Sequence, residues 1–354
     1  MKLFRYSFLF LKLLVIFIFA GLLFSCGGKF EPSQTYGQDG SLSSSDNTAA
    51  SDSNKITFSC WNTQTFFDAV CDGTEYTEFQ SEEKWTKEKY SKRLDGLCEV
   101  MTTLNPDIMV LEEIESEAVV QDIINKLAST AWDKKKSWQY TCFAKETGTA
   151  IGCAVFSRLE LKDLKVHSLD VRVHVEKQPS ERPLMEVSDI CQNKEFKLFV
   201  CHWKSKTGGE AETEIWRDWQ ESVLSGRLAN CERTGIPAVV CGDFNRNAED
   251  FIAVAEKIND SNIVLRGAGK KNMPVYCPWI SSDGKVKKEK GSYFYKNEWE
   301  RIDNIFSFGE VTLVKFQPVT NPPVADDDGK PISYKMYNET GYSDHLPLKC
   351  IILI

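Results

Sequence analysis

Two short polar segments, about 100 residues apart, constrain the fold more than any other feature of this chain. The first, Gly242-Asp243-Phe244-Asn245, directly follows the apolar run Ala238–Cys241, and the second, Ser343-Asp344-His345, precedes the run Leu348–Leu353. Short apolar runs bounded by turn residues are typical of buried strands. Because catalytic groups collect in loops at sheet edges, we expect both segments to meet at one site built from distant strand ends.

Polar side chains adjoin four other predicted strands in the same way. These are Trp61-Asn62 after Ile56–Cys60, Glu112-Glu113 after Ile108–Leu111, His202 after Lys197–Cys201, and Asp303 within the run Ile302–Phe306. The set holds carboxylates, carboxamides and two imidazoles but no thiolate, which favours Mg²⁺ or Mn²⁺ over zinc. We expect the remaining carboxylates near the second strand, Glu112 and Glu115, to be solvated.

The order of helices and strands predicts the fold class. Further strands are expected at Gln139–Ala144, Ala150–Ser157, Met185–Ile190 and Val311–Phe316, and helices at Lys84–Leu104, Ala118–Leu127 and Glu212–Ala229. In the first helix, Leu94, Leu97 and Met101 recur at steps of three and four and form one apolar face. Such mixing predicts an α/β fold, a four-layered α/β/β/α sandwich of two mixed sheets flanked by helices.

The first 25 residues are predicted to be a lipoprotein signal peptide. Lys2 and Arg5 precede a long apolar run that ends at Leu23-Phe24-Ser25-Cys26, which resembles a bacterial lipobox except that Phe24 is bulkier than usual. The sequence therefore predicts lipidated Cys26 and an exported protein anchored in a bacterial cell envelope, on the periplasmic or surface side. The alternative is a retained transmembrane anchor, because the run is long enough to span a bilayer.

Composition divides the remaining chain into a tether and one domain. Residues 26–54 begin with the lipidated cysteine and continue as a Gly-, Ser- and Asp-rich segment, which cannot bury enough apolar surface to fold and would span roughly 30 Å as a coil. Residues 55–354 have globular composition and are expected to form one monomeric domain. Of the 12 cysteines, Cys60, Cys201 and Cys241 end apolar runs and are expected to be small buried hydrophobes.

The net charge limits how the chain can bind a polyanion. The formal charge is −8, and removing the signal takes away three positive charges to leave −11. A strongly acidic protein gains nothing from bulk charge on approach to nucleic acid, so binding would need local lysines or metal. The lysine-rich segment 285–290, followed by Tyr293, Tyr295 and Trp299, could track a nucleic-acid backbone or could be a basic loop before a core strand.

Six motifs in this order resemble the endonuclease/exonuclease/phosphatase superfamily, which includes deoxyribonuclease I, exonuclease III, neutral sphingomyelinases and inositol-polyphosphate phosphatases. The resemblance covers residues 55–354. The segments His202-Trp203-Lys204-Ser205-Lys206 and Glu298-Trp299-Glu300-Arg301-Ile302-Asp303 are similar to those of a bacterial subgroup usually described as secreted nucleases. The chain departs from the commonest pattern at Glu112, where the superfamily more often has Gln.

The resemblance implies a role for each residue of the metal site. Glu113 would be the main Mg²⁺ ligand, Asn62 would hold it by a hydrogen bond, and Asp344 would contribute to the metal site.

For the hydrolysis itself, the resemblance implies that Asp243 would orient or deprotonate the attacking water, and Asn245 would steady that water and the phosphate. His345 would contact the scissile phosphate, Asp303 would hold His345 in its useful tautomer, and His202 would be the general acid. From the residues alone, Asp303 could instead pair with Arg301. Lys204 and Lys206, beside His202, are expected to contact substrate phosphate.

The implied function is a Mg²⁺-dependent phosphodiesterase, most simply an exported nuclease acting on DNA or RNA. A sphingomyelinase or phosphoinositide phosphatase remains an alternative that acts on a phospholipid headgroup, with Tyr276 and Trp279 as candidates for bilayer contact. Inositol phosphatases usually carry a Trp-Cys-Asp-Arg element that is absent here. A hypothesis from another class is a non-catalytic lipoprotein that only binds a partner at the surface.

The predicted anchor depends on one residue. Replacing Cys26 by Ser should release the protein from the membrane fraction or block its processing, because the thiol of Cys26 would carry the acyl chains. Fractionation of cells that express the full-length Cys26→Ser variant measures this. Unaltered retention with the apolar segment still attached would identify a transmembrane anchor instead.

Overall fold

The computed structural model describes residues 55–129, 137–169, 178–191, 194–251, 261–268, 272–281, 283–287 and 289–354. All of them belong to one compact unit, Leu42–Ile354. The predicted signal peptide, Cys26 and the tether lie outside the described residues, so the anchor stays a prediction. Within the described residues, no helix is long and apolar enough to cross a membrane.

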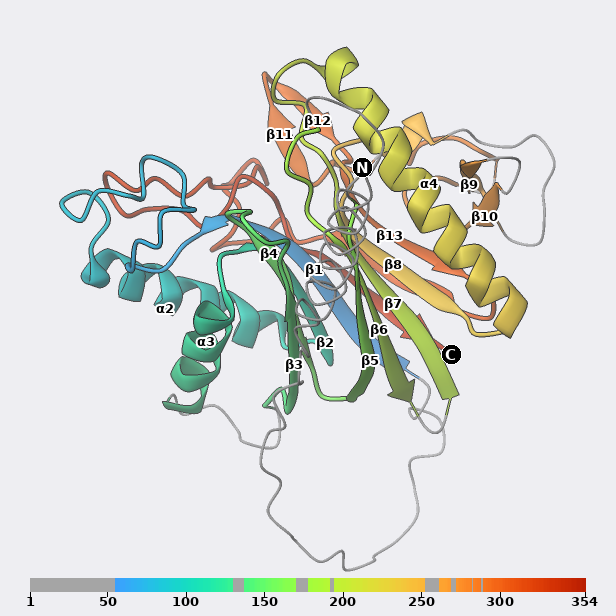
Figure 1. Ribbon diagram of the computed structural model, residues 1–354, viewed down its shortest axis with the longest axis horizontal. Helices are drawn as coiled ribbons and strands as arrows, with labels where there is room; N and C mark the ends of the chain where they lie inside the picture. The colour runs from blue at the N-terminus through green and yellow to red at the C-terminus, as the bar shows by residue number, and fades with distance from the viewer. Residues whose placement is uncertain are drawn as a thin grey trace, which may run out of the picture. The chain divides into compact units, whose positions relative to one another are not determined.

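Two mixed sheets form the centre of this unit (Figure 1). The first sheet has the order β14-β15-β1-β2-β4-β3. Its strands are β1 (Lys55–Phe66), β2 (Ile108–Ile114), β3 (Tyr140–Ala144), β4 (Gly152–Ser157), β14 (Thr312–Pro318) and β15 (Leu348–Leu353). Only the β1–β2 pair is parallel, with Asn62 opposite Glu112, and this register brings the polar ends of both strands to the same edge.

The second sheet has the order β13-β8-β7-β6-β5. Its strands are β5 (Glu160–His167), β6 (Leu184–Cys191), β7 (Lys194–His202), β8 (Ala238–Asp243) and β13 (Asp303–Phe308). Strands β7 and β8 are parallel, with His202 opposite Asp243, and β13 is antiparallel to β8, with Asp303 opposite Asp243. Three of the predicted site residues therefore lie side by side on neighbouring strands.

Helices cover the outer faces of both sheets, which confirms the predicted α/β/β/α layers (Figure 1). Helices α2 (Lys87–Leu104) and α3 (Glu117–Ser129) lie on one side, and α4 (Glu210–Thr234) lies on the other. Helix α2 begins three residues later than predicted, because the Thr86 side chain accepts a hydrogen bond from the Lys89 amide and caps the helix. The shorter elements are η2 (Ala248–Asp250), β9 (Ile263–Leu265), β10 (Met273–Val275), β11 (Tyr293–Tyr295) and β12 (Glu298–Glu300).

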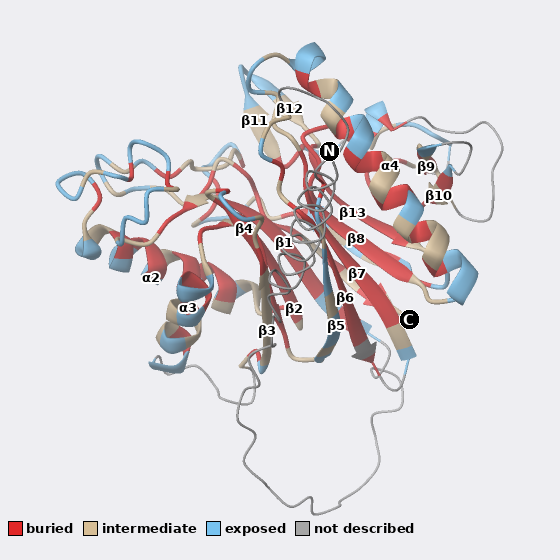
Figure 2. Cartoon of the chain, viewed as in Figure 1, coloured by how far each residue is buried: buried red, intermediate tan, exposed pale blue. Residues whose placement is uncertain are grey.

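The core follows the alternation of side chains along each strand. In β2, Ile108 and Val110 belong to an apolar cluster that includes residues of both sheets, whereas Met109 and Leu111 belong to a cluster with α2 and α3. Figure 2 shows the resulting buried layers in red, with exposed residues on the outer faces of the helices. The eleven cysteines of the described part are all free thiols, and Cys60, Cys201 and Cys241 are buried as predicted.

Two predictions about exposure were wrong. Glu112 is 0% exposed and Glu115 is 2% exposed, so neither carboxylate is solvated. Both side chains point into the protein and accept backbone hydrogen bonds, Glu112 from Asp243 at 2.7 Å and Glu115 from Asp68 at 2.5 Å. Burial raises the pKa of Glu115 to about 8, which is the expected response of a carboxyl group removed from water.

Candidate active site

Glu113 is held at the end of β2 by two hydrogen bonds from β1. Its Oε1 accepts from Asn62 Nδ2 at 3.1 Å, and its Oε2 accepts from the Thr65 amide at 2.5 Å. The Glu113 backbone has a positive φ of 62°, a sparsely populated conformation for a residue with a Cβ. Burial first, and then the charge of Asp344, raise the pKa of Glu113. A carboxylate held this firmly and still partly accessible is suited to binding a cation.

Arg93 of α2 supports this arrangement and was not singled out in the sequence. Its guanidinium donates to the carbonyls of Thr63 and Thr65, at 3.0 and 2.9 Å, and to that of Gln64. Gln64 and Thr65 both have positive φ, so Arg93 stabilises the turn that aims the Thr65 amide at Glu113. Its sequence signal is weak, because a single arginine on a helix is more often solvent-exposed than buried.

Asp243 lies at the end of β8, where Gly242 allows a close approach between neighbouring strands. Gly242 has φ +133°, and a Cβ at this position would lie 1.8 Å from the Cys201 carbonyl oxygen, so only glycine fits here. The Asp243 carboxylate accepts from the Asn245 amide at 2.8 Å and from Asn62 Nδ2 at 3.2 Å. Burial, followed by the charge of Asp303, raises the pKa of Asp243 to about 7.

Asn245 adopts a left-handed conformation with φ 47°. Its side-chain amide donates to the Trp203 carbonyl at 3.1 Å, which fixes the orientation of its oxygen. Asn245 and Asp243 both line a cavity of about 680 Å³. The turn at the end of β8 therefore presents two oxygen-bearing side chains to the same space.

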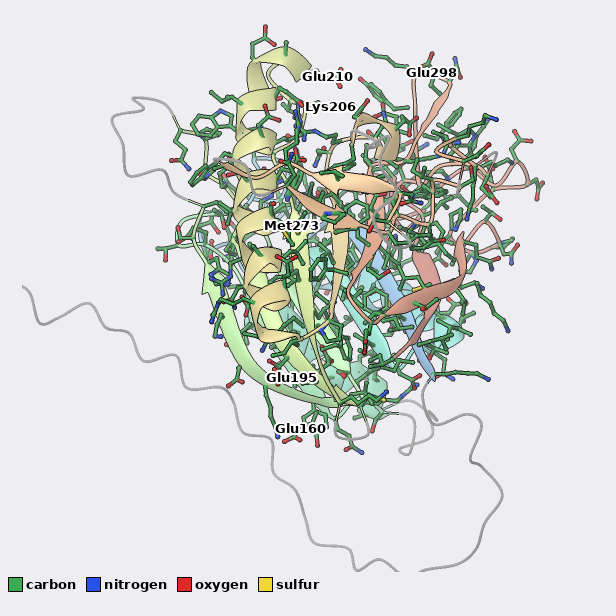
Figure 3. All side chains as sticks on the ribbon, turned by 90° about the vertical axis from the view of Figure 1, so that its right-hand side faces the viewer. Glu160, Glu195, Lys206, Glu210, Met273 and Glu298 are labelled. Carbon is green, nitrogen blue, oxygen red and sulfur yellow. The ribbon has the colours of Figure 1, made fainter. Side chains whose placement is uncertain are left out.

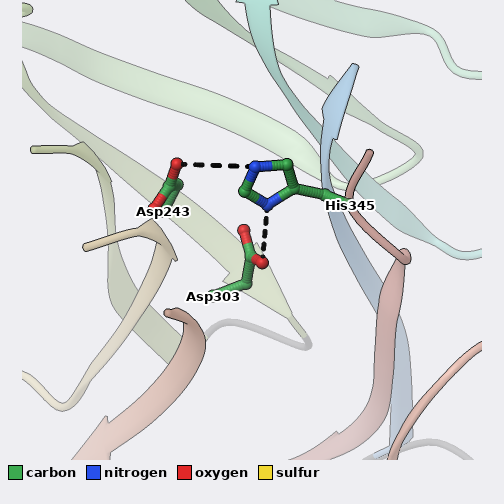
Figure 4. A group of neighbouring side chains, drawn as sticks. All are labelled: Asp243, Asp303 and His345. Carbon is green, nitrogen blue, oxygen red and sulfur yellow. Dashed lines mark hydrogen bonds and ion pairs between the residues drawn. The ribbon is translucent and has the colours of Figure 1, made fainter. Parts of the chain in front are cut away.

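His345 and Asp303 form a buried pair (Figure 4). His345 Nδ1 lies 2.8 Å from Asp303 Oδ2, and His345 Nε2 lies 4.0 Å from Asp243 Oδ2. Burial opposes a charge on His345, but Asp303, Asp344 and Asp243 outweigh it and raise its pKa well above the ordinary value. Asp303 Oδ2 also accepts from Ser292 at 2.5 Å. Asp303 is therefore the hydrogen-bond partner of His345 and not of Arg301, which forms an ion pair with Glu249.

His202 approaches the same Asp243 oxygen as His345 does. Its Nε2 is 3.6 Å from Glu113 Oε1 and 3.9 Å from Asp243 Oδ2, while its Nδ1 is buried without a hydrogen-bond partner in the described part of the chain. Burial, and then the charges of Arg182 and His345, lower its pKa well below the ordinary value. The lowered pKa favours the neutral imidazole of His202, and the two facing carboxylates favour the tautomer with its proton on Nε2.

The remaining predicted residues are placed less centrally. Asp344 Oδ1 is 4.0 Å from His345 Nε2, but Asp344 does not line the cavity. Lys204 does not line it either, because its Nζ bonds to the Ser205 and Thr207 carbonyls. Lys206 does line the cavity, and its charge is matched by Glu300 at 2.9 Å and Glu210 at 3.0 Å.

Arg182 and Tyr76 line the cavity without having been singled out in the sequence, whereas Tyr293 and Tyr295 were named there as part of a possible nucleic-acid-binding segment. Arg182 contributes a guanidinium whose Nη2 donates to the Trp203 carbonyl. Tyr76, Tyr293 and Tyr295 add three aromatic side chains. The Arg-Pro pair directly before the apolar start of β6 is the sequence signal that could have identified Arg182.

The group Asp243, Asp303 and His345 could hold a metal ion, because one ligand atom from each lies within 4.8 Å of the others. Asp303 and His345 are hydrogen-bonded to each other, whereas the carboxylates of Glu113 and Asp243 are linked through the Asn62 side-chain amide, which donates to both. Carboxylate oxygens are ligands that suit Mg²⁺ or Mn²⁺. The residues present therefore fit a hard divalent cation.

Comparison with known proteins identifies the family. Residues 57–352 match the Endonuclease/Exonuclease/phosphatase family, so the chain belongs to this family, and the predicted resemblance is confirmed. Its members are metal-dependent hydrolases that act on phosphoester bonds, and this chain is an enzyme of that class. No curated protein matches the chain.

Solved structures share the fold at low identity. Truncated TDP2 from Caenorhabditis elegans is 15% identical, with a TM-score of 0.54, and the match covers 85% of this chain and 98% of that one. The human nocturnin catalytic domain with bound sulfate is 16% identical, with a TM-score of 0.53 and coverage of 84% and 94%. TDP2 from D. rerio, complexed with a single-strand DNA product, is 16% identical, with a TM-score of 0.53 and coverage of 85% and 99%.

The role of Glu113 as a metal ligand can be tested by substitution. Glu113→Gln should weaken Mg²⁺ binding by roughly tenfold or more, because one charged ligand becomes neutral while its shape is kept. Calorimetric titration of the full-length protein with Mg²⁺ measures this without relying on activity. Glu160→Gln is a matched control at the opposite end of the domain, since Glu160 begins β5. Equal Mg²⁺ affinity in Glu113→Gln and the wild type would show that another residue holds the metal.

The pair Asp303 and His345 is expected to act as a unit. If the carboxylate acts by orienting and charging the imidazole, Asp303→Asn should lose much of the activity that His345→Ala loses. The double variant should then be scarcely worse than His345→Ala, because coupled residues are not additive. A double-mutant cycle on kcat/KM tests this, and fully additive losses would show that Asp303 acts elsewhere.

Proposed function

We propose that this chain is a Mg²⁺- or Mn²⁺-dependent phosphodiesterase that hydrolyses nucleic acid. The observation that carries the proposal is the convergence of Glu113, Asp243, His202 and His345 on one cavity of about 680 Å³, although they come from strands and loops far apart in the sequence. An intact catalytic set speaks against the non-catalytic surface lipoprotein, whose expected mark is loss of these residues.

The side chains divide the work of phosphodiester hydrolysis among them. Asp243 is suited to accept the proton of the attacking water, because a base with a pKa of about 7 is matched to neutral pH. The Asn245 side chain lies beside Asp243, and its oxygen can orient the same water. A divalent ion held by Glu113, when bound, would neutralise charge on the phosphate oxygens.

The pKa values of the two histidines are shifted in opposite directions, which suits them to different roles. His345, held charged by Asp303, can stabilise the negative charge that develops on the phosphate. His202, whose pKa is lowered by burial, keeps the role of general acid that the resemblance implies and can donate its Nε2 proton to the departing oxygen. Asn62 donates to both Glu113 and Asp243 and so links the metal ligand to the base.

One of the two residues named as candidates for bilayer contact is buried, which counts against the lipid-cleaving alternative. Trp279, named above as a candidate for bilayer contact, is only 1% exposed, and its indole donates to the Asp303 carbonyl at 2.9 Å. It therefore packs under the active site and cannot enter a bilayer. Nucleic acid is also the ligand of one structural relative, the TDP2 from D. rerio complexed with a single-strand DNA product.

The test is a Mg²⁺-dependent assay of the full-length protein against single-stranded DNA, duplex DNA, RNA, sphingomyelin and phosphoinositides. We expect nucleic-acid cleavage that EDTA abolishes and Mg²⁺ or Mn²⁺ restores. Asp243→Asn should lower the rate by at least about 100-fold, because a general base contributes 10²–10⁴-fold, and it excludes a contaminating nuclease. Robust cleavage of sphingomyelin with DNA and RNA left intact would overturn the nuclease assignment in favour of the lipid-cleaving alternative.

A further inference from the structure

Starting from the nucleic-acid function proposed above, we propose that an unpaired nucleobase next to the scissile phosphate stacks on a column of aromatic rings beside His345. The Tyr293 ring lies 4.7 Å from the His345 ring, at 34°, and the Tyr295 ring lies 6.1 Å from Tyr293, at 22°. All three residues line the active-site cavity. The column therefore leads from the phosphate-contacting imidazole towards the surface.

The hairpin β11–β12 fixes the orientation of these rings. Because alternate side chains of a strand point to opposite faces, Tyr293 and Tyr295 share one face and Phe294 takes the other. Phe294 packs on Trp299 of β12 at 5.1 Å, and Trp299 packs against the apolar cluster under α2 and α3. The hairpin is therefore anchored on one face, which leaves the two tyrosines on the side of the cavity.

Tyr295 is the open end of the column. It is 51% exposed, which is unusual for a large aromatic side chain in this domain. The Lys296 ammonium lies 5.1 Å from its ring centroid, and this long, flexible side chain can move aside for a flat ligand or contact its phosphate. A base has an aromatic face that can stack here, whereas a phospholipid headgroup has none.

Charge on the neighbouring wall argues against binding through successive phosphates. Glu210 and Glu300 neutralise Lys206, and Glu298 adds a further carboxylate to the cavity. Figure 3 shows Lys206, Glu210 and Glu298 together at one end of the domain. Carboxylates disfavour a second phosphate at this wall, so stacking is the better source of affinity here. Stacking on Tyr295 requires a base that is not paired in a duplex.

The proposal is tested with two chromogenic diesters that share one leaving group. Thymidine 5′-(p-nitrophenyl phosphate) carries a base, and methyl p-nitrophenyl phosphate does not. In both, water adds to phosphorus, the bond to the nitrophenyl oxygen breaks, and p-nitrophenolate leaves. The measured quantity is the kcat/KM for the thymidine diester divided by the kcat/KM for the methyl diester. In full-length Tyr295→Ala this ratio should fall by about tenfold, which is the effect of losing one base–aromatic stack. Most of the change should be a higher KM for the thymidine diester.

Two matched variants separate stacking from general disruption. Tyr295→Phe keeps the ring and should retain the wild-type ratio. Tyr337 is 79% exposed, the highest value among the large hydrophobic side chains of the described residues, and it lies away from the cavity. Tyr337→Ala should therefore also retain the wild-type ratio. On unmodified substrates, wild type should cleave a single-stranded oligonucleotide faster than its blunt duplex, and Tyr295→Ala should narrow that difference.

The outcomes distinguish this proposal from the proposed function. If nucleic acid and the thymidine diester are hydrolysed but Tyr295→Ala leaves the ratio of the two diesters unchanged, the stacking site is wrong and the nuclease function stands. An equal loss on both diesters would likewise overturn stacking. If neither nucleic acid nor the thymidine diester is hydrolysed in Mg²⁺ while sphingomyelin is, the proposed function itself fails.

Discussion

The buried hydrogen bond from the Asp243 amide to Glu112 Oε2, at 2.7 Å, ties the two sheets together directly beneath the active site. Glu112 ends a strand of the first sheet and Asp243 ends a strand of the second, so this contact sets the distance between the metal side and the base side of the cavity. An isolated carboxylate at 0% exposure is costly unless it is neutral or paired. Burial, followed by Cys60, Asp303 and Asp243, raises the pKa of Glu112 well above the ordinary value.

A raised pKa favours the neutral form of Glu112, and this form resembles the glutamine that the superfamily more often has at this position. A neutral carboxyl group and a carboxamide have nearly the same shape, and both offer an oxygen to the Asp243 amide. The other oxygen of Glu112 has no hydrogen-bond partner in the described part of the chain. The substitution is therefore chemically small in this environment, although the sequence alone suggests an added charge next to Glu113.

Much of the fold could be predicted because the strands that build the two sheets are apolar and buried. The strands that were not predicted are either polar and exposed or very short. β5 is largely polar and solvent-exposed at the edge of its sheet, and β9 to β12 have three residues each, too short for a periodic pattern. Helix ends differ from the predicted ones because capping residues decide them: the Thr86 side chain caps the start of α2, and Gly235 in a left-handed conformation ends α4.

The site could be predicted in part from the sequence, since each residue lies at a strand end and the ends converge at one edge of the sandwich. Charge state could not be predicted, because it depends on contacts between distant segments. Lys206 is neutralised by Glu300, 94 residues away, and the Asp303 charge that holds the His345 proton lies on another strand. The same reasoning applies to Tyr295, whose exposure depends on how the hairpin packs.

The electrostatics of the cavity connect these features. Four carboxyl groups, those of Glu113, Asp243, Asp303 and Asp344, gather around the His345 imidazole, which suits the site to a cation. The overall charge of −8 adds no attraction for a polyanion. A divalent ion can offset this charge near the scissile phosphate, and its field is screened within about 8–10 Å at ordinary ionic strength. The cavity walls carry both carboxylates and cations, and the cations include Arg182 and Lys296. Stacking on the ring column beside His345 adds an interaction with the substrate that does not depend on this mixed charge.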